Sequence, residues 1–150
     1  MLLLKKQLHQ LCLDHIQQRI NEAELAIQEA QKASNDDTKS SAGDKYETGR
    51  EMMQQETNRN LGQLNEANKL RVALNQVGTG TLSAIAETGS LIITDNGNFY
   101  LAVSAGMLSI NGEQWFAVSP ASPIGLKLKG LKQGDKFNLN NKIYLVNGVF

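Results

Sequence analysis

Three aspartates lie close together in an acidic loop that joins two long polar segments. Asp36 and Asp37 precede a serine-rich stretch and Asp44 follows it, with Lys39 between them. About thirty residues on either side have helical periodicity and contain no proline. Two such helices joined by a short loop fold back as an antiparallel hairpin. Carboxylates held at the end of a long hairpin suit a protein that must place charged groups at the bottom of a deep, narrow hole.

Each of these aspartates also has a structural interpretation. Asp44 begins the sequence Asp-Lys-Tyr-Glu, which is close to a capping box with aspartate at the cap position. Asp36 and Asp37 could be solvated turn residues, or the N-terminal charges of a short helix at the tip. The sequence leaves both interpretations open beside the chemical one.

The bulk composition excludes some classes of partner. Lys+Arg and Asp+Glu number 15 each, so the net charge is zero and gives no argument for duplex DNA or an anionic membrane. The single cysteine, Cys12, excludes an internal disulfide, and its flanking leucines predict a small buried residue. No segment approaches the roughly 20 apolar residues of a membrane span. Because Lys5 and Lys6 follow the N-terminal leucines, a signal peptide is not indicated, and we expect a cytoplasmic protein.

The composition changes sharply near Gly78. Residues 77–150 contain ten of the thirteen glycines and both prolines. We therefore predict two domains: a helical hairpin at 1–77 with an acidic tip at 34–44, and a β-rich domain at 78–150.

The apolar residues of the two helical segments predict a coiled-coil seam. In the first segment they recur at spacings of 3, 4, 3, 4 and 3: Leu13, Ile16, Ile20, Ala23, Ile27 and Ala30. The second segment has a looser stripe: Tyr46, Gly49, Met53, Leu61, Leu64, Ala67, Leu70, Leu74 and Val77. Antiparallel pairing about the loop brings Ile20 near Leu61. Alternatively, these helices could pair with a second copy as a four-helix bundle.

Turn signals organise the second half. Asn-Gly at 96–97 and at 111–112, and Asn-Asn at 140–141, each separate two apolar runs and predict β-hairpins. Five or six antiparallel strands follow from this pattern. Ser122 as N-cap, Pro123 at the first helical position and Gly130 at the far end predict one short helix. The fold class expected is α+β.

That short helix carries a family resemblance. The sequence Ser-Pro-Ile-Gly-Leu-Lys-Leu-Lys-Gly at 122–130, followed by Gly134-Asp135, resembles the C-terminal domain of the bacterial Gre transcript cleavage factors. All eight fixed positions of the family pattern S-P-I-[AG]-x-x-L-x-G-x-x-x-G-D match. The hairpin is similar too, with Asp37-Thr38-Lys39 and Ala42 followed by Tyr46 and Arg50-Glu51.

The resemblance implies an FKBP-like antiparallel β domain with one short helix, and RNA polymerase as the partner. The β domain would dock at the rim of the polymerase secondary channel through Ser122, Pro123 and Ile124. The hairpin would enter the channel and stimulate cleavage of backtracked RNA. The chain would be an accessory factor rather than an enzyme, and it would contact the RNA 3′ end only indirectly.

The resemblance also implies roles for the tip. Asp37, which matches the first acidic position of the family, would help to hold a Mg²⁺ ion shared with the polymerase in the complex, with no cofactor bound in the free protein. Asp36, Asp44 or Glu47 could supply a second carboxylate by proximity rather than by a match to the family pattern. Lys39, Lys45 and Arg50 could contact RNA phosphates, or face solvent as most charges on a coiled coil do.

The tip departs from the pattern of cleaving members, which carry two acidic residues three positions apart. Asp37 matches the first, but the second position holds Ser40, and two extra residues lie between Ala42 and Tyr46. Ala121 stands where cleaving members often have Asp. Two alternatives therefore stay open: a channel-binding modulator or inhibitor that does not stimulate cleavage, and a dimeric coiled-coil scaffold outside transcription. We expect a monomer, with the dimer as the alternative.

Overall fold

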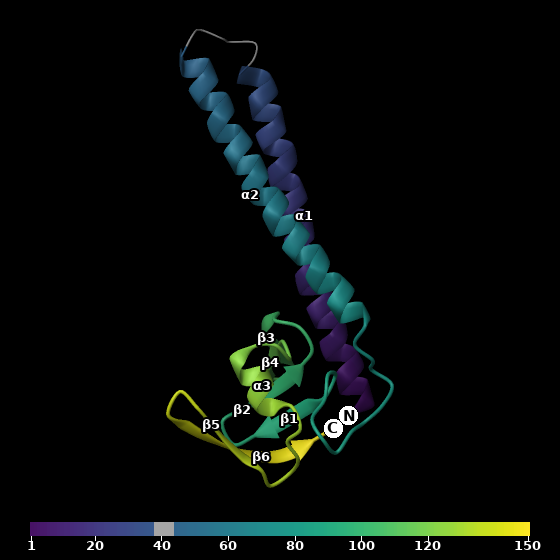
Figure 1. Cartoon of the computed structure of the whole chain (residues 1–150). Helices are drawn as coiled ribbons and strands as arrows, with labels where there is room; N and C mark the ends of the chain where they lie inside the picture. The colour runs from purple at the N-terminus through teal and green to yellow at the C-terminus, as the bar shows by residue number, and fades with distance from the viewer. Residues whose placement is uncertain (38–43) are drawn as a thin grey trace. The chain divides into compact units, whose positions relative to one another are not determined.

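The computed structural model describes the backbone of residues 1–37 and 44–150, and side chains outside 34–47. The chain forms two compact units, one made of Ile16–Lys69 and the other of Met1–His15 with Leu70–Phe150. Two long helices are followed by a six-stranded, mostly antiparallel sheet and one short helix (Figure 1). The expected α+β class is confirmed. The division into domains at residue 77 stays a prediction.

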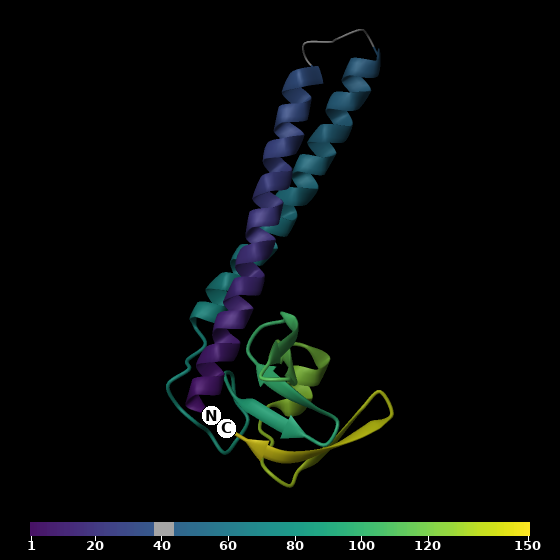
Figure 2. The ribbon, with the colours of Figure 1, turned by 180° about the vertical axis from the view of Figure 1, so that it is seen from behind.

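The two long helices are α1 (Leu2–Asp37) and α2 (Asp44–Asn75). Neither contains proline, and both are rich in residues with good helix propensity. Within Ile16–Lys69 they lie side by side and run antiparallel (Figures 1 and 2). Their outer faces carry exposed pairs one turn apart, such as Arg59 with Glu56 at 2.8 Å. Such pairs stabilise a helix by a few tenths of a kcal/mol each.

The sheet is built from three β-hairpins. Its strands are β1 (Leu91–Thr94), β2 (Gly97–Leu101), β3 (Gly106–Ile110), β4 (Glu113–Val118), β5 (Lys136–Leu139) and β6 (Lys142–Val149). The turns at 111–112 and 140–141 match the sequence signals, whereas the first turn is formed by Asp95 and Asn96, with Gly97 already paired to Thr94 in the next strand. Asn111 and Gly112 have φ of 51° and 78°, and Asn140 and Asn141 have φ of 53° and 63°. These positive values are those of the tight turn that suits the twist of a two-residue hairpin.

One pair of strands corrects the sequence interpretation. The strand order is β3-β4-β2-β1-β6-β5, and β2 pairs with β4 in parallel, with Phe99 opposite Phe116. After β2 the chain forms β3 at the edge of the sheet and then returns as β4, which lies between β3 and β2. A hairpin signal specifies which two strands pair with each other, but not where that hairpin joins the sheet, so an all-antiparallel sheet was the wrong expectation.

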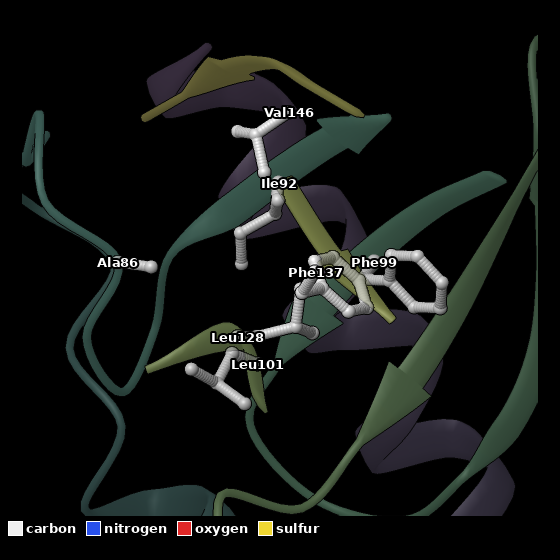
Figure 3. Packing of buried hydrophobic residues seen from close by; sticks show 7 residues of the cluster. All are labelled: Ala86, Ile92, Phe99, Leu101, Leu128, Phe137 and Val146. Carbon is white, nitrogen blue, oxygen red and sulfur yellow. The ribbon is translucent and has the colours of Figure 1, made fainter. Parts of the chain in front are cut away.

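One face of the sheet packs against the short helix α3 (Pro123–Leu128) and its flanking loops. Figure 3 shows seven buried residues of this core, which come from distant parts of the chain: Ala86, Ile92, Phe99, Leu101, Leu128, Phe137 and Val146. Tyr144 extends it by stacking on Phe137, with ring centroids 4.7 Å apart. Burial of these side chains stabilises the domain by about 1.5–3 kcal/mol for each large one.

The first turns of α1 belong to the same compact unit as the sheet. Leu8 and Cys12 of α1 are fully buried, as are Tyr100 and Trp115 on the sheet face away from α3. The prediction that Cys12 is a buried residue is therefore confirmed. Burial raises the pKa of its thiol from 9.0 to about 12. It also raises the pKa of Tyr100, with a smaller contribution from the charge of Cys12.

Candidate functional site

The hairpin seam in the unit Ile16–Lys69 is mostly apolar on α1. Ile16, Ile20, Ala23 and Ala30 are buried, as their spacing predicts. On α2 the buried positions are Asn60 and Ala67, with Leu64 half-buried between them. Spacings of 4 and 3 continue the periodicity of a two-helix seam. The arms are therefore held by one narrow line of contacts, and their remaining faces are exposed.

The structure corrects one position of the predicted seam. Leu61 is 42% exposed, whereas its neighbour Asn60 is only 6% exposed. The sequence interpretation placed Leu61 in the seam because it is apolar. Successive residues of an α-helix are rotated by about 100°, and in the structure it is Asn60 that faces the partner helix. The expectation that Leu61 lies in the seam was therefore wrong, and the polar side chain of Asn60 lies there instead.

A cavity of about 290 Å³ lies beside this asparagine, lined by Arg19, Glu22, Ala23, Ala26, Asn60 and Gln63. The alanines of α1 are too small to fill the space next to Asn60. The side-chain Nδ2 of Asn60 has no hydrogen-bond partner among the described residues. An unpaired buried amide costs about 1–3 kcal/mol, so this part of the seam is less stable than an apolar one.

The predicted tip residues lie mostly outside what the structure describes. Asp36 and Asp37 are the last two residues of α1, and Asp44 is the first residue of α2, but their side chains are not described. The aspartates are thus at the facing ends of the two helices (Figure 1). Convergence of their carboxylates stays a prediction.

The basic residues assigned to the tip are also only partly described. Lys39 lies in the segment 38–43, outside the described residues, and the side chain of Lys45 is not described either. Arg50 is exposed on the second turn of α2. Its proposed contact with RNA stays a prediction.

The predicted docking residues are at the start of α3, where Ser122 has a clear structural role. Its hydroxyl donates to the carbonyl oxygen of Ser119 at 2.6 Å and accepts from the backbone N–H of Gly125 at 3.1 Å. Ser122 is therefore the N-cap that the sequence predicts. Pro123 is exposed at the first helical position, and the half-buried Ile124 packs against the core. Of the three, Pro123 offers the most surface to a partner.

The other motif residues also have local structural roles. A Cβ at the buried Gly125 would collide with the carbonyl oxygen of Ser119. Gly130 and Gly134 have φ of 82° and 94°, which L side chains rarely adopt. Asp135 accepts a hydrogen bond from the backbone N–H of Lys132 at 3.0 Å. The motif that carries the family resemblance thus specifies a capped helix and the two turns that follow it.

Two polar residues in the first turns of α1 bind backbone carbonyl groups far along the chain, one in the segment that leads into the sheet and one at the end of α2, and the sequence interpretation missed them. Nζ of the buried Lys5 donates to the carbonyl oxygen of Thr81 at 2.7 Å, and desolvation lowers the pKa of Lys5. Nε2 of His9 lies 3.0 Å from the carbonyl oxygen of Leu74, to which it donates. Lys5 and His9 are four residues apart and therefore lie on the same face of α1, which is the sequence feature that could have predicted a shared role.

Among the side chains that the structure describes, those of residues 1–33 and 48–150, no three from His, Cys, Asp or Glu gather as a metal site. Among the same residues, no helix has the length and apolar character needed to cross a bilayer.

Comparison with known proteins gives one likeness. No protein-family model matches the chain, and no curated protein matches it either. Among solved structures, the chain is similar to one described as the structure of the transcription factor Gfh1. The two share 18% identical residues over 91% of each chain, with a TM-score of 0.35. A TM-score and an identity this low give no support to a shared function, so the functional proposal below depends on the motif and on the hairpin.

Proposed function

We propose that this chain is an accessory factor of bacterial RNA polymerase, similar to the Gre family, that acts through the secondary channel. The observation that carries the proposal is the match of residues 122–135 to all eight fixed positions of the family pattern. Each of the motif positions described above has a definite role in the capped helix α3 and its turns. The pattern is therefore a fold-specific feature rather than a chance run of residues, and it follows a long hairpin with aspartates at its end.

The β domain would supply the docking surface. Pro123 is exposed at the start of α3, and Ser122 and Ile124 fix its position through the cap and the core. A rigid anchor of this kind presents the same surface to the polymerase at every encounter, which lowers the entropic cost of binding. Localisation in the cytoplasm follows from this partner.

The hairpin would place the three aspartates in the channel. Aspartate carboxylates are hard oxygen donors of the kind that Mg²⁺ takes, so the donor set of Asp36, Asp37 and Asp44 fits such an ion. A second Mg²⁺ at the polymerase active site would supply an activated water and charge stabilisation for RNA hydrolysis. The aspartates would orient that site, and Lys39, Lys45 and Arg50 would pair with RNA phosphates.

A second function is favoured by one residue of the tip. Ser40 occupies the position where cleaving members carry their second acid. A hydroxyl is a weaker Mg²⁺ ligand than a carboxylate. A chain that docks and enters the channel with an incomplete donor set would modulate or inhibit the polymerase without stimulating cleavage.

RNA cleavage by a backtracked elongation complex separates these functions. The assay compares the wild type, Asp37→Ala and Glu29→Ala, the last being an exposed acidic residue of the same helix. A cleavage factor should stimulate RNA cleavage as the wild type and as Glu29→Ala. The stimulation should be lost in Asp37→Ala. Binding to the polymerase without stimulation by any of the three would establish the modulator instead. A chain that does not bind the polymerase at all would contradict both.

A further inference from the structure

The two edges of the β-sheet differ in how they are protected. Among the described strands, β3 pairs only with β4, and β5 pairs only with β6, so these two form the edges. An unpaired strand edge is a template for another strand, and proteins usually block it with charges or proline. The edge at β5 carries Lys136, and Lys142 lies opposite Leu139. The edge at β3, with the sequence Gly-Met-Leu-Ser-Ile, has neither charge nor proline.

The register of β3 shows which of its backbone groups face outward. Ile110 and Glu113 close a two-residue turn, so they exchange both backbone hydrogen bonds. Hydrogen-bonded pairs then alternate along the strand, and Leu108 is the next residue bonded to β4. The N–H and C=O groups of Met107 and Ser109 therefore point away from the sheet. Both residues are exposed, Met107 by 53%.

An apolar row on the sheet adjoins this free edge. Met107 lies directly opposite Phe116 on β4, and Phe116 lies opposite Phe99 on β2. The rings of Phe99 and Phe116 are 5.9 Å apart. Phe99 is buried in the core, whereas Phe116 and Met107 are exposed. The edge thus combines free backbone groups with uncovered apolar side chains.

We propose that β3 is a self-association edge, at which a second copy of this chain pairs antiparallel with β3 and extends the sheet. A two-fold axis through Leu108 places Met107 of each copy opposite Ser109 of the other. The outward N–H and C=O groups of both residues then form four hydrogen bonds. Gly106 falls opposite Ile110, so the five residues of the strand are matched in full.

A second copy fits this edge for two further reasons. The strand carries no charge, so pairing with itself brings no like charges together, whereas β5 paired with itself would bring lysines close. The two Met107 side chains become diagonal neighbours on one face and cover each other's apolar surface. A contact of five residues is smaller than a standard interface, so we expect a dissociation constant of about 0.1 mM. This association does not depend on the proposed polymerase function.

Sedimentation equilibrium of the full chain tests the proposal from about 10 μM to about 1 mM, a range that brackets the expected constant. Ser109→Pro removes one outward N–H, and Asn138→Pro removes the equivalent outward N–H at the β5 edge as a matched control. Met107→Lys is a second variant that retains the backbone and adds a charge at the edge. Circular dichroism confirms that each variant is folded before its mass is measured.

The expected result is a mass that rises with concentration from 16.4 kDa toward twice that value in the wild type and in Asn138→Pro. Ser109→Pro and Met107→Lys should associate at least tenfold more weakly, so that both remain mostly monomeric at about 0.1 mM. Amide hydrogen exchange should show protection of Met107 and Ser109 that grows with concentration. A wild type that is monomeric throughout would overturn the proposal. So would a dimer that persists in Met107→Lys.

Discussion

Ser122 shows how one side chain can define a motif through its local structural role. Its hydroxyl makes two hydrogen bonds, one to the loop before α3 and one to the first turn of the helix. Neither bond needs a partner protein. The strongest feature of the family resemblance is therefore explained by the requirements of the fold, and Pro123 is the exposed residue beside it.

The cap predicts a measurable loss of stability. Ser122→Ala should lower the free energy of unfolding by about 1 kcal/mol, because the N–H of Gly125 loses its acceptor. Ser122→Thr should retain most of the stability, since its hydroxyl can both accept from Gly125 and donate to Ser119. Urea denaturation measures both. Ser104→Ala, at an exposed serine, is the control, and a Ser122→Ala variant as stable as this control would contradict the role of the cap.

The buried thiol of Cys12 predicts a dependence of stability on pH. Its pKa is raised from 9.0 to about 12 in the folded protein. Above pH 9 the unfolded chain releases this proton while the folded chain retains it, so the contribution of Cys12 to stability falls as pH rises. The fall is about 1.4 kcal/mol per pH unit between the two pKa values. The thiol should also react slowly with alkylating reagents at pH 8 until the protein is unfolded.

Cys12→Ala isolates this effect from other groups. Tyr100 also has a raised pKa, and Lys5 has a lowered one that acts in the opposite direction. The variant loses packing at every pH, but its stability should fall less steeply than that of the wild type between pH 9 and pH 10.5. Equal slopes for the two proteins would show that the thiol is not buried as described.

At the scale of elements, the seam of the hairpin contains a polar residue that an apolar one could replace. Asn60→Leu should raise the thermal midpoint of the hairpin, because it removes an unpaired amide and fills part of the adjacent cavity. We expect a gain of about 1–3 kcal/mol. Asn65→Leu, at an exposed position of the same helix, should change little. A loss of stability in Asn60→Leu would show that the amide has a stabilising partner.

Several elements could be predicted from the sequence because their signals are local. The turns at 111–112 and 140–141 are flanked by the predicted strands, and Ser122 and Pro123 begin the predicted helix. The parallel pairing of β2 with β4 could not be predicted, since it depends on packing between hairpins rather than on any turn. Asn60 was missed because the sequence interpretation followed apolar residues and therefore chose its neighbour Leu61 for the seam.

The candidate site was less predictable than the fold. The start of α3 follows from cap and proline preferences, and the structure places Ser122, Pro123 and Ile124 together there. The arrangement of Asp36, Asp37 and Asp44 depends on side chains at the hairpin end that lie outside the described residues. Sequence identifies these carboxylates but does not specify the distances between them, on which the proposed binding of Mg²⁺ depends.

At the scale of the whole molecule, two compact units share the two long helices. In the same unit as α3, Lys5 binds the first turns of α1 to the segment before the sheet, and His9 binds them to the end of α2. The hairpin arms form the other unit and end at the aspartates. In the proposed function, the first unit would bind the polymerase and the aspartates at the end of the second would carry the chemistry of the tip.

The most direct test of this account uses iron(II) in place of Mg²⁺ at the active centre of RNA polymerase. Hydroxyl radicals made there cut any polypeptide close to the metal, whether or not RNA cleavage is stimulated. With end-labelled protein bound to the polymerase, we expect cuts confined to residues 34–44 and none in 78–150. Binding without any cut in the hairpin, or cuts within the β domain, would contradict insertion of the tip into the channel.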